Sequence, residues 1–359
     1  MSKKAILKLE DGSTYEGFSF GFEKSVSGEL VFYTAMVGYP ESLSDPSYKG
    51  QILVPTYPMI GNYGIPADCE EEGVSIYLES GKVQCSALII SDYSDKYSHW
   101  YAGKSLGEWL KEWEVPGLWG IDTRELTKKL REKGSMLGKI IFDGEDIPFR
   151  DPNQENLVEQ VSTREITTYG KGSLKVTMVD CGMKNNILRC LLKHDVTVKR
   201  VPWDYDFNQD DYDGLFISNG PGDPAKCLET IEHLRTAIQG GRPIMGICLG
   251  NQLLALAAGA KTYKLKYGHR SHNQPAIIPG THRCFITSQN HGFAIDEKSL
   301  PEDWEVLFRN LNDGTNEGIR HKSKPFFSTQ FHPEACSGPV DTEPLFAEFV
   351  ENMKKYKAK

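Results

Sequence analysis

The chain has 359 residues, which is enough for about two domains of ordinary size, each with its own hydrophobic core. Hydrophobic residues make up 39% of the chain and charged residues 25%, which excludes disordered, fibrous and collagen-like proteins. The formal net charge of −8 gives no overall attraction to nucleic acid or to an anionic membrane, so we expect neither as a partner.

Residues 1–142 are expected to form a mixed α/β domain, in which short strands alternate with turns before one clear helix. Residues 5–9 show the alternation of apolar and polar residues that is typical of a half-buried strand. Asp122 with Glu125 three residues later is a capping-box pattern and predicts the start of the helix. Gly134 marks its expected end.

Residues 143–173 differ in composition from the segments on either side. They are polar, they include two prolines, and they close with the glycine-containing segment 169–173. Such a composition is typical of loops. We therefore interpret residues 143–173 as the connection between two domains.

Residues 174–359 are expected to form a second domain in which strands and helices alternate. This spacing builds βαβ units around a mostly parallel open sheet flanked by helices, and no internal repeat interrupts it. Ligand sites collect where parallel strands end, so the turns after Asn219 and Ile247 are the expected location of a site. The predicted strands cover 174–180, 196–202, 214–219 and 243–247, and the predicted helices 185–194, 228–238, 251–258 and 345–353.

The sequence predicts neither a membrane span nor a targeting segment. The longest apolar run, residues 253–260, is far shorter than the roughly 18 residues that a spanning helix needs. Strand-like alternation begins within residues 1–10, which leaves no room for a signal peptide. The 8 cysteines form no CxxC pair and no zinc-site spacing, so we expect reduced thiols and no metal site. A cytoplasmic protein is expected, or a mitochondrial one whose transit peptide has been removed.

One cysteine has the sequence context of a nucleophile. Cys248 lies in the segment Gly246-Ile-Cys-Leu-Gly250, between an apolar strand and a predicted helix. The small residues on both sides permit the strained turn of a nucleophile elbow, and the helix N-terminus favours a thiolate. The alternative is a buried structural cysteine, since free cysteines are among the most buried residues.

A thiol nucleophile needs a base, and the base needs a group that orients it. His332 and Glu334 follow an apolar strand and lie two residues apart, so a strand end can direct both into one cleft. The alternative is a strand cap without chemistry. His269 and His272 remain ambiguous, and an ordinary solvated or structural role is expected of other histidines: His99, His194, His233, His282 and His321.

The loop Ser218-Asn-Gly-Pro-Gly-Asp-Pro224 follows a predicted strand and has the properties of an oxyanion hole. Its glycines, Gly220 and Gly222, let backbone N–H groups approach a ligand closely. A second donor would be the N–H of Leu249, directly after the candidate nucleophile. A tight turn without a ligand is the alternative for this loop taken alone.

Together these motifs resemble those of a family, the class I (triad-type) glutamine amidotransferases. The resemblance includes Gln289-Asn-His-Gly-Phe293 and Phe331-His-Pro-Glu334, in the family's order and spacing. The N-terminal half is similar to the small subunit of carbamoyl phosphate synthetases, so the resemblance covers essentially the whole chain. The segments that carry this second similarity are 29–41, 45–48, 56–62 and 121–127.

The resemblance implies a glutaminase reaction through a cysteine thioester. Cys248 would attack the γ-carboxamide of glutamine, His332 would transfer the proton, and Glu334 would hold the imidazole. Glutamate and ammonia would be the products. The family's glutamine contacts fall on Ser47, Gly220, Gly222, Leu249, Gln252, Asn290, Gly292 and Phe293, of which the first belongs to the N-terminal domain.

The resemblance also implies a partner. Ammonia would pass through an internal tunnel to a large synthetase subunit, or to fused synthetase domains, which make carbamoyl phosphate for pyrimidine or arginine biosynthesis. ATP, magnesium and bicarbonate are expected on that partner, with no cofactor in this chain. Gly103-Lys-Ser105 imitates the end of a P-loop, but Ser98 replaces the first glycine, so we interpret the segment as a surface turn.

One residue departs from the family pattern, because Asn251 stands where most members have histidine before the glutamine of the elbow helix. Urea-cycle relatives that have lost the cysteine carry a similar Gly-Asn, yet Cys248 is present here and we predict retained activity. Three alternatives remain: an amidotransferase for another synthetase such as those making anthranilate or CTP, a non-catalytic scaffold subunit, and a papain-like protease.

Overall fold

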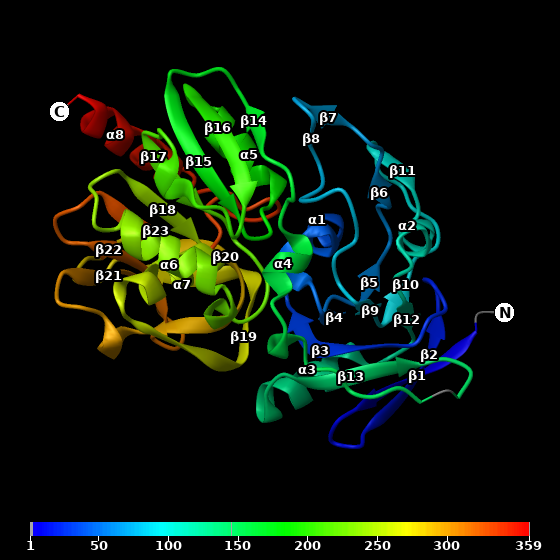
Figure 1. Ribbon diagram of the computed structural model, residues 1–359. Coiled ribbons are helices and arrows are strands. Elements are labelled where there is room, and N and C mark those ends of the chain that lie inside the picture. Colours follow the sequence, from blue (N-terminus) through cyan, green and yellow to red (C-terminus); the bar gives the residue numbers. More distant parts are fainter. Residues whose placement is uncertain (1–2, 145, 359) are drawn as a thin grey trace. The chain divides into compact units, whose positions relative to one another are not determined.

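The computed structural model describes residues 3–144 and 146–358, which form two compact units that divide between Gln154 and Glu155 (Figure 1). The expected α/β class is confirmed. Among the helices in the described part of the chain, none combines the length and the apolar character that crossing a membrane requires. Each unit has its own hydrophobic core.

The first unit is built on a closed barrel of short strands in the order β1-β13-β3-β4-β9-β12-β2 (Figure 1). Apolar side chains from its strands and helices fill one core, which includes Val31, Leu53, Leu88 and Leu110. The barrel strands are β1 (Lys4–Leu9), β2 (Thr14–Ser19), β3 (Val26–Tyr33), β4 (Gln51–Pro55), β9 (Ala87–Ile89), β12 (Gly117–Trp119) and β13 (Met136–Ile141).

Short two-stranded pairs and helices complete the first unit. The pairs are β5 (Met59–Ile60) with β10 (Asp92–Tyr93), β6 (Ile65–Pro66) with β11 (Ala102–Lys104), and β7 (Glu70–Glu71) with β8 (Val74–Ser75). The helical segments are α1 (Tyr39–Ser44), η1 (Pro46–Tyr48), α2 (Leu106–Glu112), α3 (Thr123–Lys133) and η2 (Pro152–Gln154).

The predicted helix of this unit is confirmed as α3. The Asp122 carboxylate accepts hydrogen bonds from the backbone N–H groups of Arg124 and Glu125, which satisfies two donors that the helix leaves unpaired. Gly134 ends the helix with φ of 107°, a conformation that a side chain would strain.

The interpretation of Gly103-Lys-Ser105 as a surface turn was wrong. Gly103 and Lys104 belong to strand β11, which pairs antiparallel with β6. Ser105 is the N-cap of α2, where it and Glu108 form a reciprocal capping box. The serine that completes the apparent P-loop motif therefore begins a helix by a local hydrogen bond.

The second unit contains a ten-stranded sheet in the order β14-β16-β15-β17-β18-β23-β22-β21-β19-β20 (Figure 1). The strands are β14 (Thr167–Tyr169), β15 (Leu174–Asp180), β16 (Val196–Pro202), β17 (Gly214–Ile217), β18 (Ile244–Ile247), β19 (Lys261–Ile277), β20 (Cys284–Asp296), β21 (Trp304–Asn310), β22 (Asn316–His321) and β23 (Phe326–Thr329).

The parallel part of this sheet consists of neighbouring strands β16, β15, β17, β18 and β23. Strand β14 and the strands from β22 to β20 extend it antiparallel on the two sides. The stretch predicted as an interdomain connection, 143–173, thus contributes β14 to the sheet of the second unit, and it also contains η2 and α4 (Leu157–Val161).

Helices cover the parallel strands and bury the core of the second unit. Helix α5 (Asn185–Leu192) packs on β16, α7 (Leu249–Ala258) on β18 and β23, α8 (Pro344–Lys357) on β17, and α6 (Leu228–Ala237) on α7. Ile231 and Leu234 of α6 are buried as their helical spacing predicts, but Leu228 in its first turn is 64% exposed. Short helical turns are η3 (Phe207–Gln209), η4 (Pro224–Lys226) and η5 (Glu297–Ser299).

Candidate active site

Cys248 occupies a strained turn between β18 and α7. Its φ of 54° and ψ of −102° lie outside the regions that a residue with a side chain prefers, as expected of a nucleophile elbow. A Cβ at Gly246 would lie 2.6 Å from the carbonyl oxygen of Gly250, and one at Gly250 would lie 2.3 Å from that of Ile217. The two glycines are therefore needed because the backbone passes so close to itself.

The elbow places Cys248 at the N-terminus of α7. Its carbonyl oxygen accepts hydrogen bonds from the N–H groups of Asn251 and Gln252, and its own N–H donates to Thr329 at 2.7 Å. The side chain is buried, and its Sγ lies 3.6 Å from the carbonyl oxygen of Asn290. The start of α7 thus lies next to the thiol, so its N–H groups can donate to a negative charge that develops there.

His332 and Glu334 follow β23 and form a buried pair. Glu334 Oε1 lies 2.7 Å from His332 Nδ1, and the backbone N–H of His332 donates to the carbonyl oxygen of Ser288 at 2.9 Å. No hydrogen-bond partner of His332 Nε2 is found in the part of the chain that the structure describes. This nitrogen is therefore open to a reacting group.

The charges of this pair are set by its neighbours. Burial alone would lower the pKa of His332, but the charge of the Glu334 carboxylate and its hydrogen bond to the imidazole outweigh burial and raise the pKa to about 10. Burial alone would raise the pKa of Glu334, but Lys184 and His332 lower it to about 2. These charges make His332 a strong base and stabilise the imidazolium that forms when it accepts a proton from the thiol.

Lys184 is a charged residue of this site that the sequence analysis missed. Its Nζ lies 3.1 Å from Glu334 Oε1, and both side chains are buried. Lys184 precedes α5, and its backbone N–H donates to Asn219 Oδ1 at 3.0 Å. The available signal was its position shortly after β15, since strand ends of a parallel sheet meet at one edge.

The predicted glycine loop follows β17 and lies against the elbow. A Cβ at Gly220 would come within 2.1 Å of the Cys181 carbonyl oxygen and 2.8 Å of a Leu249 side-chain carbon, so the loop and the start of α7 are adjacent. Gly222 has φ of 82°, which favours glycine. This brings together the segments of Gly222 and Leu249, whose N–H groups are the predicted oxyanion donors.

Other predicted glutamine contacts also gather around the elbow. Gln252 Nε2 donates to the carbonyl oxygen of Phe293 at 2.9 Å, and the carbonyl of Asn290 faces the thiol. Gly292 lies between them on β20, where a Cβ would meet Arg270 at 3.3 Å. Ser47 belongs to η1 of the first unit, where its N–H donates to Asp45 Oδ1 at 2.9 Å.

Asn251, the departure from the family pattern, is fully buried in α7. Its Nδ2 donates to Gln330 Oε1 at 3.1 Å, and its Oδ1 accepts from Ser328 Oγ at 2.8 Å. Gln252 Nε2 donates to the same Gln330 oxygen at 3.0 Å. Asn251 therefore has partners for both ends of its amide and ties α7 to the segment that leads to His332.

One group of side chains in residues 3–144 and 146–358 has the proximity expected of metal ligands. It consists of His269, His291 and Glu317, whose nearest polar atoms all lie within 4.8 Å of one another. These residues lie on β19, β20 and β22 and are all buried. They hydrogen-bond to protein groups, so they have a role without an ion.

Two family models match the chain. One, described as "Carbamoyl-phosphate synthase small chain, CPSase domain", covers residues 7–140, and the other, "Glutamine amidotransferase class-I", covers residues 177–352. The "Carbamoyl phosphate synthase arginine-specific small chain" of Aspergillus fumigatus is 50% identical over 367 residues, which cover 99% of this chain and 81% of that protein.

Two longer relatives match over the same region. "Multifunctional protein CAD" of Squalus acanthias is 56% identical over 360 residues, which are 98% of this chain and 16% of that protein. The mitochondrial carbamoyl-phosphate synthase (ammonia) of Homo sapiens is 50% identical over 362 residues, which are 99% of this chain and 24% of that protein. The chain thus spans less than a quarter of either longer relative. By its match to the arginine-specific small chain over nearly its whole length, the chain belongs to the carbamoyl-phosphate synthase small-chain family.

Proposed function

We propose that the chain hydrolyses glutamine to glutamate and ammonia through a cysteine thioester. The observation that carries this proposal is the buried site in which the strained Cys248 adjoins the His332–Glu334 pair. Amide hydrolysis of this kind needs a nucleophile, a proton carrier and an oxyanion site, and candidates for all three lie at the elbow.

The first half of the reaction forms the thioester. His332 Nε2 takes the thiol proton of Cys248, and the sulfur attacks the side-chain carbonyl carbon of glutamine. The N–H groups of Leu249 and Gly222 donate to the oxygen that becomes negative. The carbon–nitrogen bond then breaks, and His332 returns the proton to the departing nitrogen, which leaves as ammonia.

The second half releases glutamate. His332 takes a proton from water, and the resulting hydroxide attacks the thioester carbon. The carbon–sulfur bond then breaks, and His332 gives its proton to the sulfur, which restores the Cys248 thiol. Glu334 accepts a hydrogen bond from Nδ1 of the imidazole throughout, which fixes the tautomer with Nε2 facing the reacting atoms. Lys184 keeps this carboxylate ionised, since it helps to lower its pKa.

We propose that the remaining predicted contacts bind glutamine around this centre. They are Ser47, Gly220, Gly222, Leu249, Gln252, Asn290, Gly292 and Phe293. Support comes from the hydrogen bond between Gln252 and Phe293 and from the approach of Asn290 to the thiol, which place residues distant in sequence at one elbow.

The ammonia is proposed to pass to a synthetase subunit, or to fused synthetase domains, that makes carbamoyl phosphate from bicarbonate and ATP. The family membership and the longer relatives support a partner of this kind. ATP, magnesium and bicarbonate would bind to that partner, and the hydrolysis proposed for this chain needs no cofactor. No disulfide joins any of its 8 cysteines, which supports a reducing compartment such as the cytosol.

The test measures glutamate release by the wild type, Cys248→Ser and His332→Asn, each alone and with a carbamoyl phosphate synthetase large subunit. The wild type should hydrolyse glutamine and be accelerated by the partner. Both variants should fail, while synthesis from added ammonia survives in their complexes. If the wild type binds the partner yet releases no more glutamate than Cys248→Ser, the chain is a scaffold and the proposal fails.

A further inference from the structure

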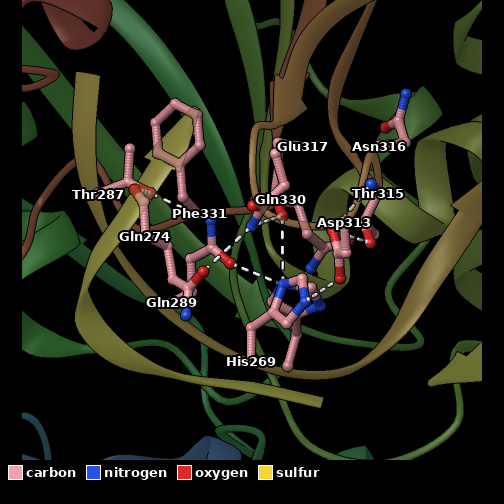
Figure 2. A network of polar contacts seen from close by, with 12 residues as sticks. His269, Gln274, Thr287, Gln289, Asp313, Thr315, Asn316, Glu317, Gln330 and Phe331 are labelled. Carbon is pink, nitrogen blue, oxygen red and sulfur yellow. Dashed lines mark hydrogen bonds and ion pairs between the residues drawn. The ribbon is translucent and has the colours of Figure 1, made fainter. Parts of the chain in front are cut away.

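A second histidine–carboxylate cluster lies on the other side of β20 from the thiol. His269 Nε2 is 2.7 Å from Asp313 Oδ2, and its Nδ1 is 3.4 Å from Glu317 Oε1. His269 is on β19, Asp313 lies between β21 and β22, and Glu317 is on β22. His269 and Glu317 are buried and Asp313 is half-exposed, and Figure 2 shows His269 at the centre of the network.

One residue of the cluster, His269, carries a positive charge. Burial alone would lower the pKa of His269, but hydrogen bonds to Asp313 and Glu317 raise it to about 9. Burial raises the pKa of Glu317, so the ion pair is His269 with Asp313, and Glu317 acts mainly as a hydrogen-bond partner. Other titratable or charged groups that face the cluster are His291, whose pKa burial lowers, Arg270, and Tyr263, whose pKa is raised by burial and by the charge of Asp313.

The cluster contacts β20 through one side chain, that of Gln289. Gln289 Oε1 accepts a hydrogen bond from His269 Nδ1 at 2.9 Å, and Gln289 Nε2 donates to Thr287 Oγ1 at 3.1 Å (Figure 2). Gln289 is itself buried. Its side-chain amide is therefore held at both ends, with the charged histidine as the stronger donor.

The residues on either side of Gln289 touch the two reacting groups. The carbonyl oxygen of Ser288 accepts the backbone N–H of His332 at 2.9 Å. The carbonyl oxygen of Asn290 lies 3.6 Å from Cys248 Sγ. Because backbone carbonyls two residues apart on a strand point to the same edge, those of Ser288 and Asn290 contact the base and the nucleophile from one edge of β20, on either side of the clamped Gln289.

Glu317 connects to the same site through its backbone. Its carbonyl oxygen accepts the N–H of Gln330 at 2.8 Å, two residues before His332. Gln330 Oε1 in turn accepts from Asn251 and Gln252 of the elbow helix. The cluster thus adjoins both the strand between the reacting groups and the segment that carries the base.

We propose that His269, Asp313 and Glu317 are positioning residues that hold the β20 segment Ser288–Asn290 in place between Cys248 and His332. The inference rests on the proposed glutaminase function and adds residues that never touch glutamine. Loss of the charged hydrogen bond would let Gln289 and its neighbours shift. A displacement of about 1 Å is enough to lower a rate about a hundredfold.

The first experiment compares glutaminase kinetics of the wild type, Asp313→Asn and Glu317→Gln, each in complex with a synthetase large subunit. We expect kcat/KM for glutamine to fall about tenfold at pH 8 in Asp313→Asn and less in Glu317→Gln, which retains a hydrogen-bonding side chain. Ammonia-dependent carbamoyl phosphate synthesis should stay unchanged in all complexes.

The pH dependence separates positioning by a charged histidine from a general structural role. The His269 contribution is present below its folded pKa and is lost as pH rises through about 9 in the wild type. Without the Asp313 carboxylate this pKa moves down toward its ordinary value. The deficit of Asp313→Asn should therefore be large at pH 8 and shrink toward pH 6, whereas a merely loosened fold gives the same deficit at both.

Alkylation of Cys248 by iodoacetamide, followed at its own peptide by mass spectrometry, reports the site without glutamine turnover. Asp313→Asn should change this rate at least threefold, because the thiol faces β20. The matched control is Asp303→Asn, which breaks a similar pair, since His321 Nε2 lies 3.2 Å from Asp303 Oδ2 at the far end of β22. That variant should alter neither readout.

The outcomes are distinguishable. A wild type that releases no glutamate defeats the proposed function, while a changed alkylation rate in Asp313→Asn would still support positioning of the thiol. An active wild type with Asp313→Asn and Glu317→Gln equal to it in both readouts overturns the positioning proposal. Stoichiometric Zn²⁺ binding, lost in Glu317→Gln and measured by titration with the metal alone, would overturn it too, because a metal at His269 and His291 would replace the Gln289 clamp.

Discussion

Two histidine–carboxylate pairs flank β20, and they differ in one respect that decides their chemistry. His332 with Glu334 and His269 with Asp313 have the same separation of 2.7 Å, and in both pairs the pKa of the histidine is raised, to about 10 and about 9. His269 uses both ring nitrogens on fixed partners, whereas His332 Nε2 has none among the described residues. The pKa of the histidine is raised in both pairs, so this property does not distinguish them. Of the two histidines, only His332 has a ring nitrogen, Nε2, that is open to exchange a proton with a reacting group.

Replacing the carboxylate of the open pair should have the largest effect. Glu334→Gln removes the charge that stabilises the imidazolium and leaves the buried Lys184 without its Glu334 partner charge. We expect kcat for glutamine hydrolysis to fall about a thousandfold. Single-turnover glutamate release checks this, and a fall no larger than that of Asp313→Asn would erase the proposed difference between the two pairs.

Removing the neighbouring cation should have a smaller effect. In Lys184→Met the pKa of Glu334 should rise toward its ordinary value, since Lys184 helps to lower it, and kcat should fall about tenfold. The free energy of unfolding should fall by about 1–3 kcal/mol as a buried charge loses a partner.

The stability of this variant should also respond differently to acid. A carboxylate with a lowered folded pKa stabilises the fold above its unfolded value, near 4.5, and the gain disappears as pH falls toward 2. Lys184→Met should therefore lose less stability over this range than the wild type. The matched control is Lys193→Met, which breaks an exposed pair with Glu343 and should leave both properties unchanged.

Alkaline titration separates the two histidines. Both have folded pKa values above the ordinary value of 6.5, so each stabilises the fold below pH 6.5 and loses this contribution as pH rises through its folded pKa. Urea denaturation between pH 6.5 and 10 should show a decrease of about 1–3 kcal/mol for each. His269→Gln should remove the decrease that ends near pH 9, and identical curves for the wild type and this variant would contradict it.

The smallest effect is expected from a pair that touches neither face of β20. Asp303→Asn should change kcat/KM by less than about twofold, because single surface ion pairs contribute little. His321 and Asp303 lie at the other end of β22 from Glu317. A clear loss of activity in this variant would mean that disturbing any histidine in the unit affects the site. The effect of Asp313→Asn would then not be specific to the pair beside β20.

The local parts of the site could be predicted from sequence. The elbow is specified within five residues, because the strand, the two glycines and the following helix are adjacent in the chain. The strands β15 and β16 also have their predicted bounds, since apolar and polar residues alternate at the start of each, as in Leu174, Val176 and Met178. Here the sequence and the structure agree because the determining contacts are short-range.

The rest could not be predicted, because it depends on contacts between distant segments. Lys184 and Glu334 are 150 residues apart, and no local pattern shows that they meet. Strands β19 and β22 carry buried polar residues such as His269 and Glu317, so they lack the apolar alternation by which strands are recognised. His269 is therefore ambiguous from sequence alone, and its contacts with Asp313 and Glu317 emerge only in the structure.

The backbone conformation of Cys248 has a consequence for how this fold can change over time. Its positive φ has a conformational cost that glycine would not incur. The flanking Gly246 and Gly250 are fixed by close backbone contacts, whereas the central side chain is under no such steric requirement. Stability alone would therefore favour glycine at position 248, and selection for the thiol must act continuously to retain it. Once that selection is relaxed, the nucleophile is the part of the elbow most easily lost, and the scaffold survives without it.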